Sequence, residues 1–377
     1  MSGRDGGRPS QNGLNFTKPK RKKRYWILGL IAFGVSADLF LFSLFFSEKD
    51  ELIRREISFA QGENTLEGVL ITSENMDESP PCIVFVHGSG DTPRDNFGYY
   101  ETYWKKFAQQ GWCSLSWDKP GVGGSSGDWM KQTMQERAAE VSAAVDYLRS
   151  FPGLRETPIG LIGFSQAGWV MPKTAKMRDD LAFIISVSGA GNWMEQSRYS
   201  GSIRLQSEGY SDAEIATVTE FSARIDEAIM SGVSYQRYTQ LMTDAPEGEE
   251  APMSQAYWGF VQRNWQSDVR KDLRDITIPF LGIFGGHDAY VDPVNTAKTY
   301  IEELAKSTSE PFEIVTFQKA DHGLMLSVKV QPNHQGFGAW GLLFKIWFYG
   351  ERMFPDDYFP TLQNWLNRYT NERSLDG

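Results

Sequence analysis

The sequence of 377 residues predicts an α/β fold, with a mostly parallel sheet and helices on both of its faces. Short apolar runs typical of buried strands alternate along most of the chain with amphipathic stretches of helical period. This alternation is characteristic of parallel strands joined by crossover helices. The composition agrees, because 41% hydrophobic and 23% charged residues are ordinary for a globular protein. The length allows one full core and an insertion.

The N-terminal segment has a different composition. Residues 1–25 form a basic tail that contains the run KPKRKKR. The next stretch begins at Trp26 and ends at Phe46, contains one charged residue, Asp38, and is long enough as a helix to cross a hydrocarbon core about 30 Å thick. We therefore expect one transmembrane helix at 26–46 that precedes the folded part.

The positive-inside rule places the basic tail in the cytoplasm and the rest of the chain on the other side of the membrane. Residues 47–377 contain 30 basic and 46 acidic side chains, and this acidic excess argues against a nucleic-acid partner. The sequence VSA at 35–37 resembles a signal-peptidase site, but the apolar stretch continues beyond it, which favours an uncleaved signal anchor over a cleaved peptide. We expect a single-pass membrane protein with an extracytoplasmic domain.

The folded part is expected to comprise a core at 52–191 and 271–372. An antiparallel hairpin over 57–60 and 68–72 comes first, since the turn sequence QGEN separates two strand-like runs. Strand and helix patterns then alternate. The expected strands are 83–86, 113–117, 159–162, 184–187, 279–284 and 312–317, and the expected helices are 100–110, 135–150, 166–176 and 360–370.

Residues 192–270 interrupt this alternation and are expected to form a helical cap over the site. Two helix-prone segments, 213–230 and 235–242, occur there without a convincing strand. The segment is rich in aromatic residues, which either pack the cap onto the core or line a pocket for an acyl or aryl group. The acidic loop at 244–250 is either solvated or available to hold a substrate amine.

Ser165 is the strongest candidate for a catalytic nucleophile. It stands in the sequence GFSQAG at 163–168, directly after an apolar strand-like run and directly before a helical stretch. A serine hydroxyl is a weak nucleophile at neutral pH, so it requires exposure on a tight strand-to-helix turn, beside a base and beside N–H groups. Ala167 departs from the usual G-x-S-x-G pattern, because a second glycine normally stands at that position.

An acid and a base follow Ser165 in the order that this motif requires. Asp288 and His322 each come shortly after an apolar strand-like run. Because parallel strands end at the same edge of a sheet, we expect both side chains to lie near Ser165. Asp292 is the alternative acid, although the proline that follows it is typical of a helix N-cap.

A glycine-rich loop, HGSG at 87–90, follows the expected strand at 83–86. Loops of this kind donate backbone N–H groups to the oxyanion of a tetrahedral intermediate. We expect the N–H groups of Ser89 and Gln166 to form this oxyanion hole. The histidine of the loop is expected to anchor it.

With these motifs the chain resembles the α/β-hydrolases, in particular the bacterial esterase, thioesterase and serine aminopeptidase-like branches that carry an HG-x-G loop and a G-F-S-x-[GA]-G elbow. The resemblance covers residues 52–372 and implies the α/β-hydrolase fold. It includes the sequence DKPGVGGS at 118–125, which is similar to a loop beside the active site in that family. For Asp118 the resemblance implies a structural rather than a catalytic role.

The expected reaction is hydrolysis of a small-molecule acyl substrate. His322 accepts the proton of Ser165, Asp288 orients the imidazole, and water resolves the acyl-enzyme. Carboxyl esters are the first substrates expected, with peptide N-termini or acyl thioesters as alternatives, and a catalytically inactive anchored binding protein is an alternative of another class. We expect no cofactor and no metal site, since no Cys/His spacing suggests one. The sequence leaves the oligomeric state open.

Two further features have alternative interpretations. Cys82 and Cys113 each begin a predicted strand, and adjacent parallel strands rarely offer disulfide geometry, so we expect two buried free thiols rather than a disulfide. The aromatic stretch FGAWGLLFKIWFYGERMF at 337–354 forms either a buried helix at the sheet edge or a surface that touches the bilayer.

Overall fold

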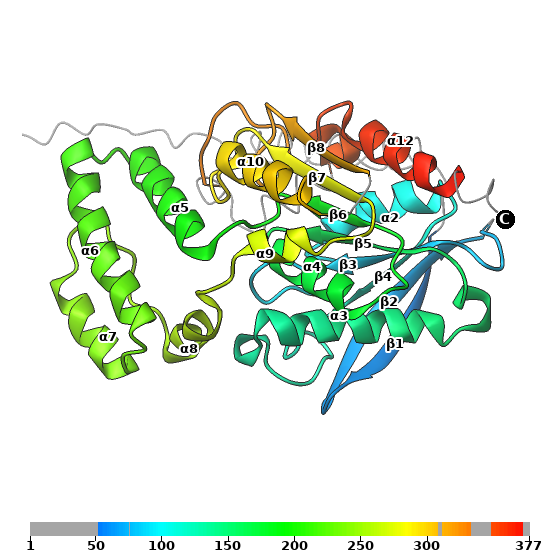
Figure 1. Ribbon diagram of the computed structural model, residues 1–377, viewed down its shortest axis with the longest axis horizontal. Helices are drawn as coiled ribbons and strands as arrows, with labels where there is room; N and C mark the ends of the chain where they lie inside the picture. Colours follow the sequence, from blue (N-terminus) through cyan, green and yellow to red (C-terminus); the bar gives the residue numbers. More distant parts are fainter. Residues whose placement is uncertain (1–51, 75, 308–310, 333–347, 372–377) are drawn as a thin grey trace, which may run out of the picture. The chain divides into compact units, whose positions relative to one another are not determined.

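A single eight-stranded sheet organises the described part of the chain (Figure 1). The computed structural model describes residues 52–74, 76–307, 311–332 and 348–371. The strands are β1 (Leu52–Gln61), β2 (Asn64–Ser73), β3 (Cys82–Val86), β4 (Cys113–Trp117), β5 (Ile159–Phe164), β6 (Ile184–Val187), β7 (Phe280–Gly285) and β8 (Phe312–Phe317). Their order in the sheet is β1-β2-β4-β3-β5-β6-β7-β8. The β1–β2 and β2–β4 pairs are antiparallel, and the other five are parallel.

Helices cover both faces of this sheet, as the alternating sequence pattern predicts. Strand side chains divide between two cores: Val84 of β3 points into one and Phe85 into the other. The first core includes α3 (Met134–Arg149), α4 (Ala167–Met177), α9 (Val269–Arg274) and α10 (Pro293–Leu304). The second core includes α2 (Tyr100–Ala108) and α12 (Tyr358–Asn371).

The first four of the five α-helices between β6 and β7 lie in the part of the sequence where strand patterns stop (Figure 1). They are α5 (Trp193–Glu208), α6 (Asp212–Met230), α7 (Tyr235–Leu241) and α8 (Gln255–Asn264). Helices α6 to α8 have a small core of their own, in which the rings of Tyr238 and Trp258 stack with centroids 4.2 Å apart. These helices therefore form an insertion that buries its own apolar side chains.

Local sequence signals account for several element boundaries. The predicted hairpin is confirmed, with Gln61 paired to Asn64 across a turn in which Gly62 has a φ of +59°. Thr133 and Glu136 form a capping box that starts α3, because each side chain accepts the other's backbone N–H group. Such caps satisfy the first N–H groups of a helix, which have no partner within the helix.

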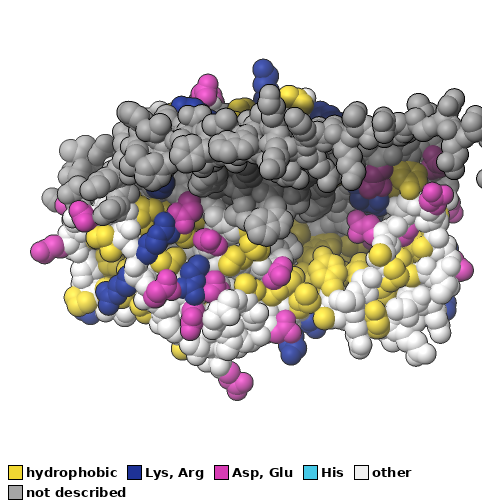
Figure 2. All heavy atoms as spheres, turned by 180° about the vertical axis from the view of Figure 1, so that it is seen from behind, with side chains coloured by type: hydrophobic (Ala, Val, Ile, Leu, Met, Phe, Trp, Pro, Cys, Tyr) yellow, Lys and Arg dark blue, Asp and Glu magenta, His cyan; other side chains and the backbone are white. Residues whose placement is uncertain are grey.

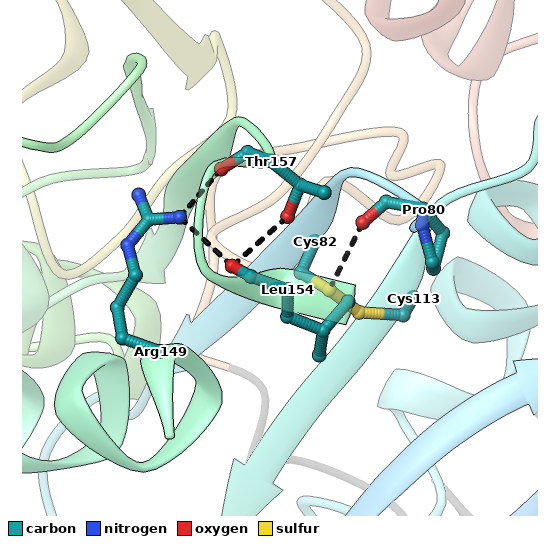
Figure 3. The surroundings of a disulfide bond; sticks show 6 residues. All are labelled: Pro80, Cys82, Cys113, Arg149, Leu154 and Thr157. Atoms are coloured by element: carbon teal, nitrogen blue, oxygen red, sulfur yellow. Dashed lines mark hydrogen bonds between the residues drawn. A yellow bond between two sulfur atoms is a disulfide. The ribbon is translucent and has the colours of Figure 1, made fainter. Parts of the chain in front are cut away.

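The expectation of two free cysteines is wrong, because Cys82 and Cys113 form a disulfide (Figure 3). The two residues are direct partners in the register of the parallel strands β3 and β4, with Cα atoms 4.5 Å apart. That separation lies within the range that a disulfide can bridge. Arg149 secures the neighbouring loop by donating to the carbonyl oxygens of Leu154 and Thr157.

Basic and acidic side chains are interspersed on the face drawn in Figure 2, with hydrophobic side chains between them. Among the described residues, cationic side chains pair with carboxylates, for example Arg54 with Glu101 and Arg368 with Glu313. No helix among the described residues is long and apolar enough to cross a membrane. The expected anchor at 26–46 lies outside the described residues.

Only the C-terminal part of the aromatic stretch at 337–354 belongs to the described residues. There Phe354 is buried and packs against Tyr99, Tyr103 and Tyr358. Tyr349, by contrast, is exposed. The end of this stretch therefore contributes to the core that α2 and α12 cover.

Candidate active site

Ser165 stands on the turn between β5 and α4, with a backbone φ of +54°. This left-handed conformation is uncommon for a residue with a side chain, and it is the strained geometry expected of a nucleophile elbow. The turn is tight: a Cβ on Gly168 would lie 2.6 Å from the backbone nitrogen of Ala190. A Cβ on Gly163 would lie 2.6 Å from the Cβ of Ala167, so the missing side chain at 163 makes room for the alanine methyl at 167.

Asp288 and His322 follow β7 and β8 and are in direct contact. Oδ2 of Asp288 lies 2.7 Å from Nδ1 of His322, while Oδ1 accepts the backbone N–H groups of Tyr290 and Val291. The Asp288 side chain is fully buried, and its carboxylate oxygens accept hydrogen bonds. Nδ1 of His322 therefore carries a proton, and Nε2 is left to accept one. Strands β5, β6, β7 and β8 are successive parallel neighbours, so Ser165, Asp288 and His322 share one sheet edge.

Asp292, the alternative acid, has a different role. Its Oδ1 accepts the N–H groups of Val294 and Asn295, and it is the N-cap of α10, whose first residue is Pro293. This is the helix-cap function that the sequence predicts for it. The geometry thus brings Asp288, not Asp292, to His322.

Asp288 also governs the charge of His322. Burial lowers the pKa of His322, but the charge of Asp288 and its hydrogen bond raise it, with a further rise from Asp321, and the net shift is upward from 6.5. The imidazolium that forms when a histidine accepts a proton is stabilised in this setting. His322 is therefore placed to act as a base that Asp288 supports.

The loop that begins at His87 lies beside the elbow, since a Cβ on Gly88 would be 3.4 Å from the Cβ of Ser165. His87 is buried, and its Nε2 donates to the carbonyl oxygen of Trp117 while its Nδ1 accepts from the hydroxyl of Tyr100. Burial and the nearby Lys119 lower the pKa of His87 to about 3. His87 is thus neutral and anchors the loop that carries Ser89.

The peptide group between Ser165 and Gln166 is held through its carbonyl oxygen, on the side opposite to the N–H of Gln166. The carbonyl oxygen of Ser165 accepts the backbone N–H groups of Gly168 and Ala190, at 2.9 and 3.0 Å. A trans peptide points its C=O and N–H in opposite directions, so these bonds fix the direction of the Gln166 N–H. Gln166 also lies at the N-terminus of α4, where the helix dipole favours a negative charge.

Asp118, at the start of the DKPGVGGS loop, makes structural contacts. It accepts the backbone N–H of Arg94 at 2.7 Å and the Arg94 guanidinium at 2.8 Å. Burial raises the pKa of the Asp118 carboxyl, but the hydrogen bonds from Arg94 outweigh this and hold the pKa below its usual range. These contacts agree with the structural role that the resemblance implies.

Sequence reasoning did not identify a chain of three buried tyrosines behind the base. The hydroxyl of Tyr99 donates to the carbonyl oxygen of Gly323, and the hydroxyl of Tyr103 lies 3.0 Å from that of Tyr99 and 2.8 Å from that of Tyr358. Each hydroxyl has one proton and a carbonyl only accepts. Tyr358 therefore donates to Tyr103, and Tyr103 donates to Tyr99. This chain holds the residue that follows His322.

Tyr199 was also missed, because an aromatic residue on a polar helix carries no distinct signal. Its hydroxyl donates to the backbone carbonyl of Asp288 at 2.7 Å, which ties α5 to the turn of the acid. Burial and the nearby Asp288 raise the pKa of Tyr199 to about 12. The insertion therefore contacts the candidate site directly.

Comparison with known proteins agrees with this geometry. Residues 68–323 match the model of a family described as X-Pro dipeptidyl-peptidase (S15 family). The chain belongs to the S15 family. It is accordingly a serine hydrolase of the S15 and esterase kind, and the predicted α/β-hydrolase superfamily is confirmed. No curated protein sequence matches this S15 chain.

One solved structure supports the same fold, and two others are similar to the chain. An esterase of Pyrococcus furiosus is similar at a TM-score of 0.52 and 15% identity, over 84% of this chain and 91% of that one. An acylaminoacyl peptidase of Pyrococcus horikoshii has a TM-score of 0.48 at 20% identity, over 74% of this chain and 39% of that one. An esterase of Butyrivibrio proteoclasticus, bound to ferulic acid, has a TM-score of 0.48 at 17% identity, over 79% and 98%.

The contacts of the two aspartates predict opposite outcomes for the same amide substitution. Asp288→Asn keeps one oxygen for the N–H groups of Tyr290 and Val291 but turns an NH2 donor toward Nδ1 of His322, which reverses the histidine tautomer, so we expect kcat to fall by up to about 10⁴-fold with the fold retained. Asp292→Asn, the matched control, keeps a capping oxygen and should shift Tm slightly with near-normal kcat. Steady-state kinetics and thermal unfolding of both variants check this, and the reversed pattern would move the acid to Asp292.

The raised pKa of His322 predicts the pH dependence. The base must be neutral to accept a proton, so kcat/KM should rise with pH through a pKa above 6.5. In Asp288→Asn this rise of kcat/KM, the acid limb of the pH profile, should move to lower pH. The reason is that the charge of Asp288 and its hydrogen bond no longer raise the pKa of His322. Asp321→Asn should move the limb less, since Asp321 contributes the smallest rise. A limb that stays in place in Asp288→Asn would contradict the assignment.

Proposed function

We propose that this chain is a membrane-anchored serine hydrolase that cleaves carboxyl esters through an acyl-enzyme on Ser165. The observation that carries the proposal is the 2.7 Å contact between Asp288 and His322, at the same sheet edge as a serine with left-handed backbone. A strained serine, an oriented histidine and a buried carboxylate are the three parts that nucleophilic acyl transfer requires.

In the proposed mechanism, Nε2 of His322 accepts the hydroxyl proton as Oγ of Ser165 attacks the substrate carbonyl carbon. The resulting imidazolium is stabilised by Asp288, and the backbone N–H groups of Ser89 and Gln166 bind the oxyanion. His322 then returns the proton to the leaving alcohol. Water, activated by the same histidine, releases the acid and regenerates the serine.

The choice of an ester substrate rests on the aromatic character of the insertion, which we propose to be a cap over the site. Several of its aromatics, including Tyr238, Trp258 and Phe260, are buried in packing. Others, including Trp193 and Tyr257, are partly exposed, and Trp193 stacks on Trp169, which follows Ser165 by four residues. Such rings suit a medium acyl or aryl group.

Cleavage of peptides is the second candidate, since the matching family model is that of dipeptidyl-peptidases. A peptide substrate brings a free amine, which an acidic side chain of the insertion would have to hold. Glu249 and Glu250 lie in the acidic loop, but Glu249 accepts from Ser222 and Glu250 pairs with Arg204. These two glutamates therefore already have partners, which favours an ester substrate over a peptide substrate.

We also propose that the anchor at 26–46 holds the hydrolase outside the cytoplasm. The disulfide between Cys82 and Cys113 supports this location, since disulfides persist in oxidising compartments and are rare in the cytosol. The basic tail before the apolar stretch supports the orientation.

Replacement of the nucleophile tests the reaction. Ser165→Ala should abolish ester hydrolysis and labelling by a fluorophosphonate without lowering Tm, because the hydroxyl alone is lost. A panel of p-nitrophenyl acyl esters, an aryl ester, an acyl thioester and aminoacyl and dipeptidyl p-nitroanilides should give kcat/KM about 10²-fold higher for the best ester than for the best peptide. Normal turnover by folded Ser165→Ala would refute the mechanism, and efficient peptidase activity without esterase activity would reverse the substrate ranking.

Topology and oxidation state test the location. Protease added to spheroplasts should digest the hydrolase domain, and an alkylating reagent should label neither Cys82 nor Cys113 in denatured protein until a reductant is added. Both outcomes follow from an exported domain with a formed disulfide. Full protection from protease, a mature N-terminus at Asp38, or two thiols alkylated without reductant would contradict the proposal.

A further inference from the structure

Two buried cations lie behind the loop that carries Ser89, and the mechanism above does not use them. Lys119 follows β4 and has no exposed surface. Its Nζ donates to the carbonyl oxygens of Gly88 at 3.0 Å and Gly90 at 2.6 Å, and it lies 4.6 Å from the ring centre of Trp129. One ammonium group therefore holds the carbonyl groups of the residues before and after Ser89.

The second cation, Arg137, bridges the same loop and the elbow. It lies on α3 with 3% of its surface exposed. One guanidinium nitrogen donates to the carbonyl oxygen of His87 at 2.8 Å, and the other donates to the side-chain oxygen of Gln166. Arg137 thus ties together the two segments that would donate the oxyanion N–H groups.

Neither cation is neutralised by a neighbour. Within the described residues, no carboxylate lies within ion-pair distance of Lys119 or Arg137. The nearby Glu140 is buried and accepts from Trp117 Nε1 and Gln132 Nε2, each at 2.6 Å. Burial lowers the pKa of Lys119, and repulsion by Arg137 lowers it further, while Glu140 and Asp91 raise it; of these two carboxylates only Glu140 is buried. Uncompensated buried charge is costly, so these positions call for a functional reason.

Peptide geometry supplies this reason. The N–H of Ser89 belongs to the peptide whose carbonyl oxygen is that of Gly88, and a trans peptide directs the two groups oppositely. A cation on the carbonyl side therefore directs the N–H toward the serine side and also polarises it, because hydrogen bonds in series strengthen one another in a low dielectric. The excess positive charge further favours a negative charge that appears only in the transition state.

We propose that Lys119 and Arg137 are positioning residues: Lys119 orients and polarises the peptide N–H of Ser89, and Arg137 fixes the loop of Ser89 and the side chain of Gln166 relative to each other. The proposal rests on the proposed function, since it assigns a role within the same acyl transfer. The two cations act through the backbone and through Gln166, and neither touches the substrate. Their effect falls on the charged transition state and not on the neutral ground state.

The test compares Lys119→Met and Arg137→Met with Arg149→Met. Arg149 is a matched control, because it lies on the same helix α3 and also donates to backbone carbonyls, but beside the disulfide (Figure 3). Rates of ester hydrolysis are expressed per active site, counted by complete fluorophosphonate labelling. The Lys119 and Arg137 variants should lose about 10²-fold to 10³-fold in kcat with KM changed less than about threefold.

A transition-state analogue gives a readout that a purely structural role would not move. A trifluoromethyl ketone binds a serine hydrolase as an anionic hemiketal, so its affinity should fall by the same factor as kcat/KM in these two variants. Arg149→Met should lower Tm while leaving kcat per active site and the affinity for the ketone unchanged. Arg137→Lys, which keeps the charge, should recover part of the kcat that Arg137→Gln loses, and both remain informative if Arg137→Met fails to fold.

Unchanged kcat per active site in Lys119→Met and Arg137→Gln, with Ser165→Ala inactive, would overturn this inference and leave the proposed function intact. An equal loss in Arg149→Met would also overturn it, since the effect would then be one of general stability. Activity in folded Ser165→Ala would instead refute the proposed function, and this inference with it.

Discussion

The left-handed turn at Ser165 is the constraint on which the rest of the site depends. A residue with a side chain pays about 1–2 kcal/mol for this conformation, so neighbouring structure must hold it. The N–H of Ser165 donates to Val187 at the end of β6, and its carbonyl accepts from Gly168 and from Ala190. The turn is thus held by the adjacent strand and the loop after it, and not by its own sequence alone.

The polar groups around this turn form one connected arrangement. Asp288 fixes His322, the insertion reaches Asp288 through Tyr199, and the tyrosine chain reaches the residue after His322. Nearly all these groups are buried, where hydrogen bonds are strong and unpaired groups are costly. His322 is consequently held from several elements at once, an arrangement that would suit the proposed site, where charge develops.

Much of the fold and of the candidate site could be predicted from local patterns. The apolar runs and helical periods identified the strands that precede Ser165, Asp288 and His322, and the proline after Asp292 indicated a helix cap, which the structure confirms. The prediction about Cys82 failed for a specific reason. Strand patterns indicate where strands begin, but they do not give the register between β3 and β4, and it is the register that makes these cysteines direct partners.

By itself, the sequence determined the fold class, the hairpin, the order of Ser165, Asp288 and His322, and the strand ends at which they stand, because these follow from composition, periodicity and turn residues along the chain. Only the tertiary structure decided which buried groups meet. The disulfide and the convergence of Lys119 and Arg137 on one loop both join residues distant in sequence. Such contacts depend on strand order, register and the rotation of each helix about its axis, and none of these leaves a local signal in the chain.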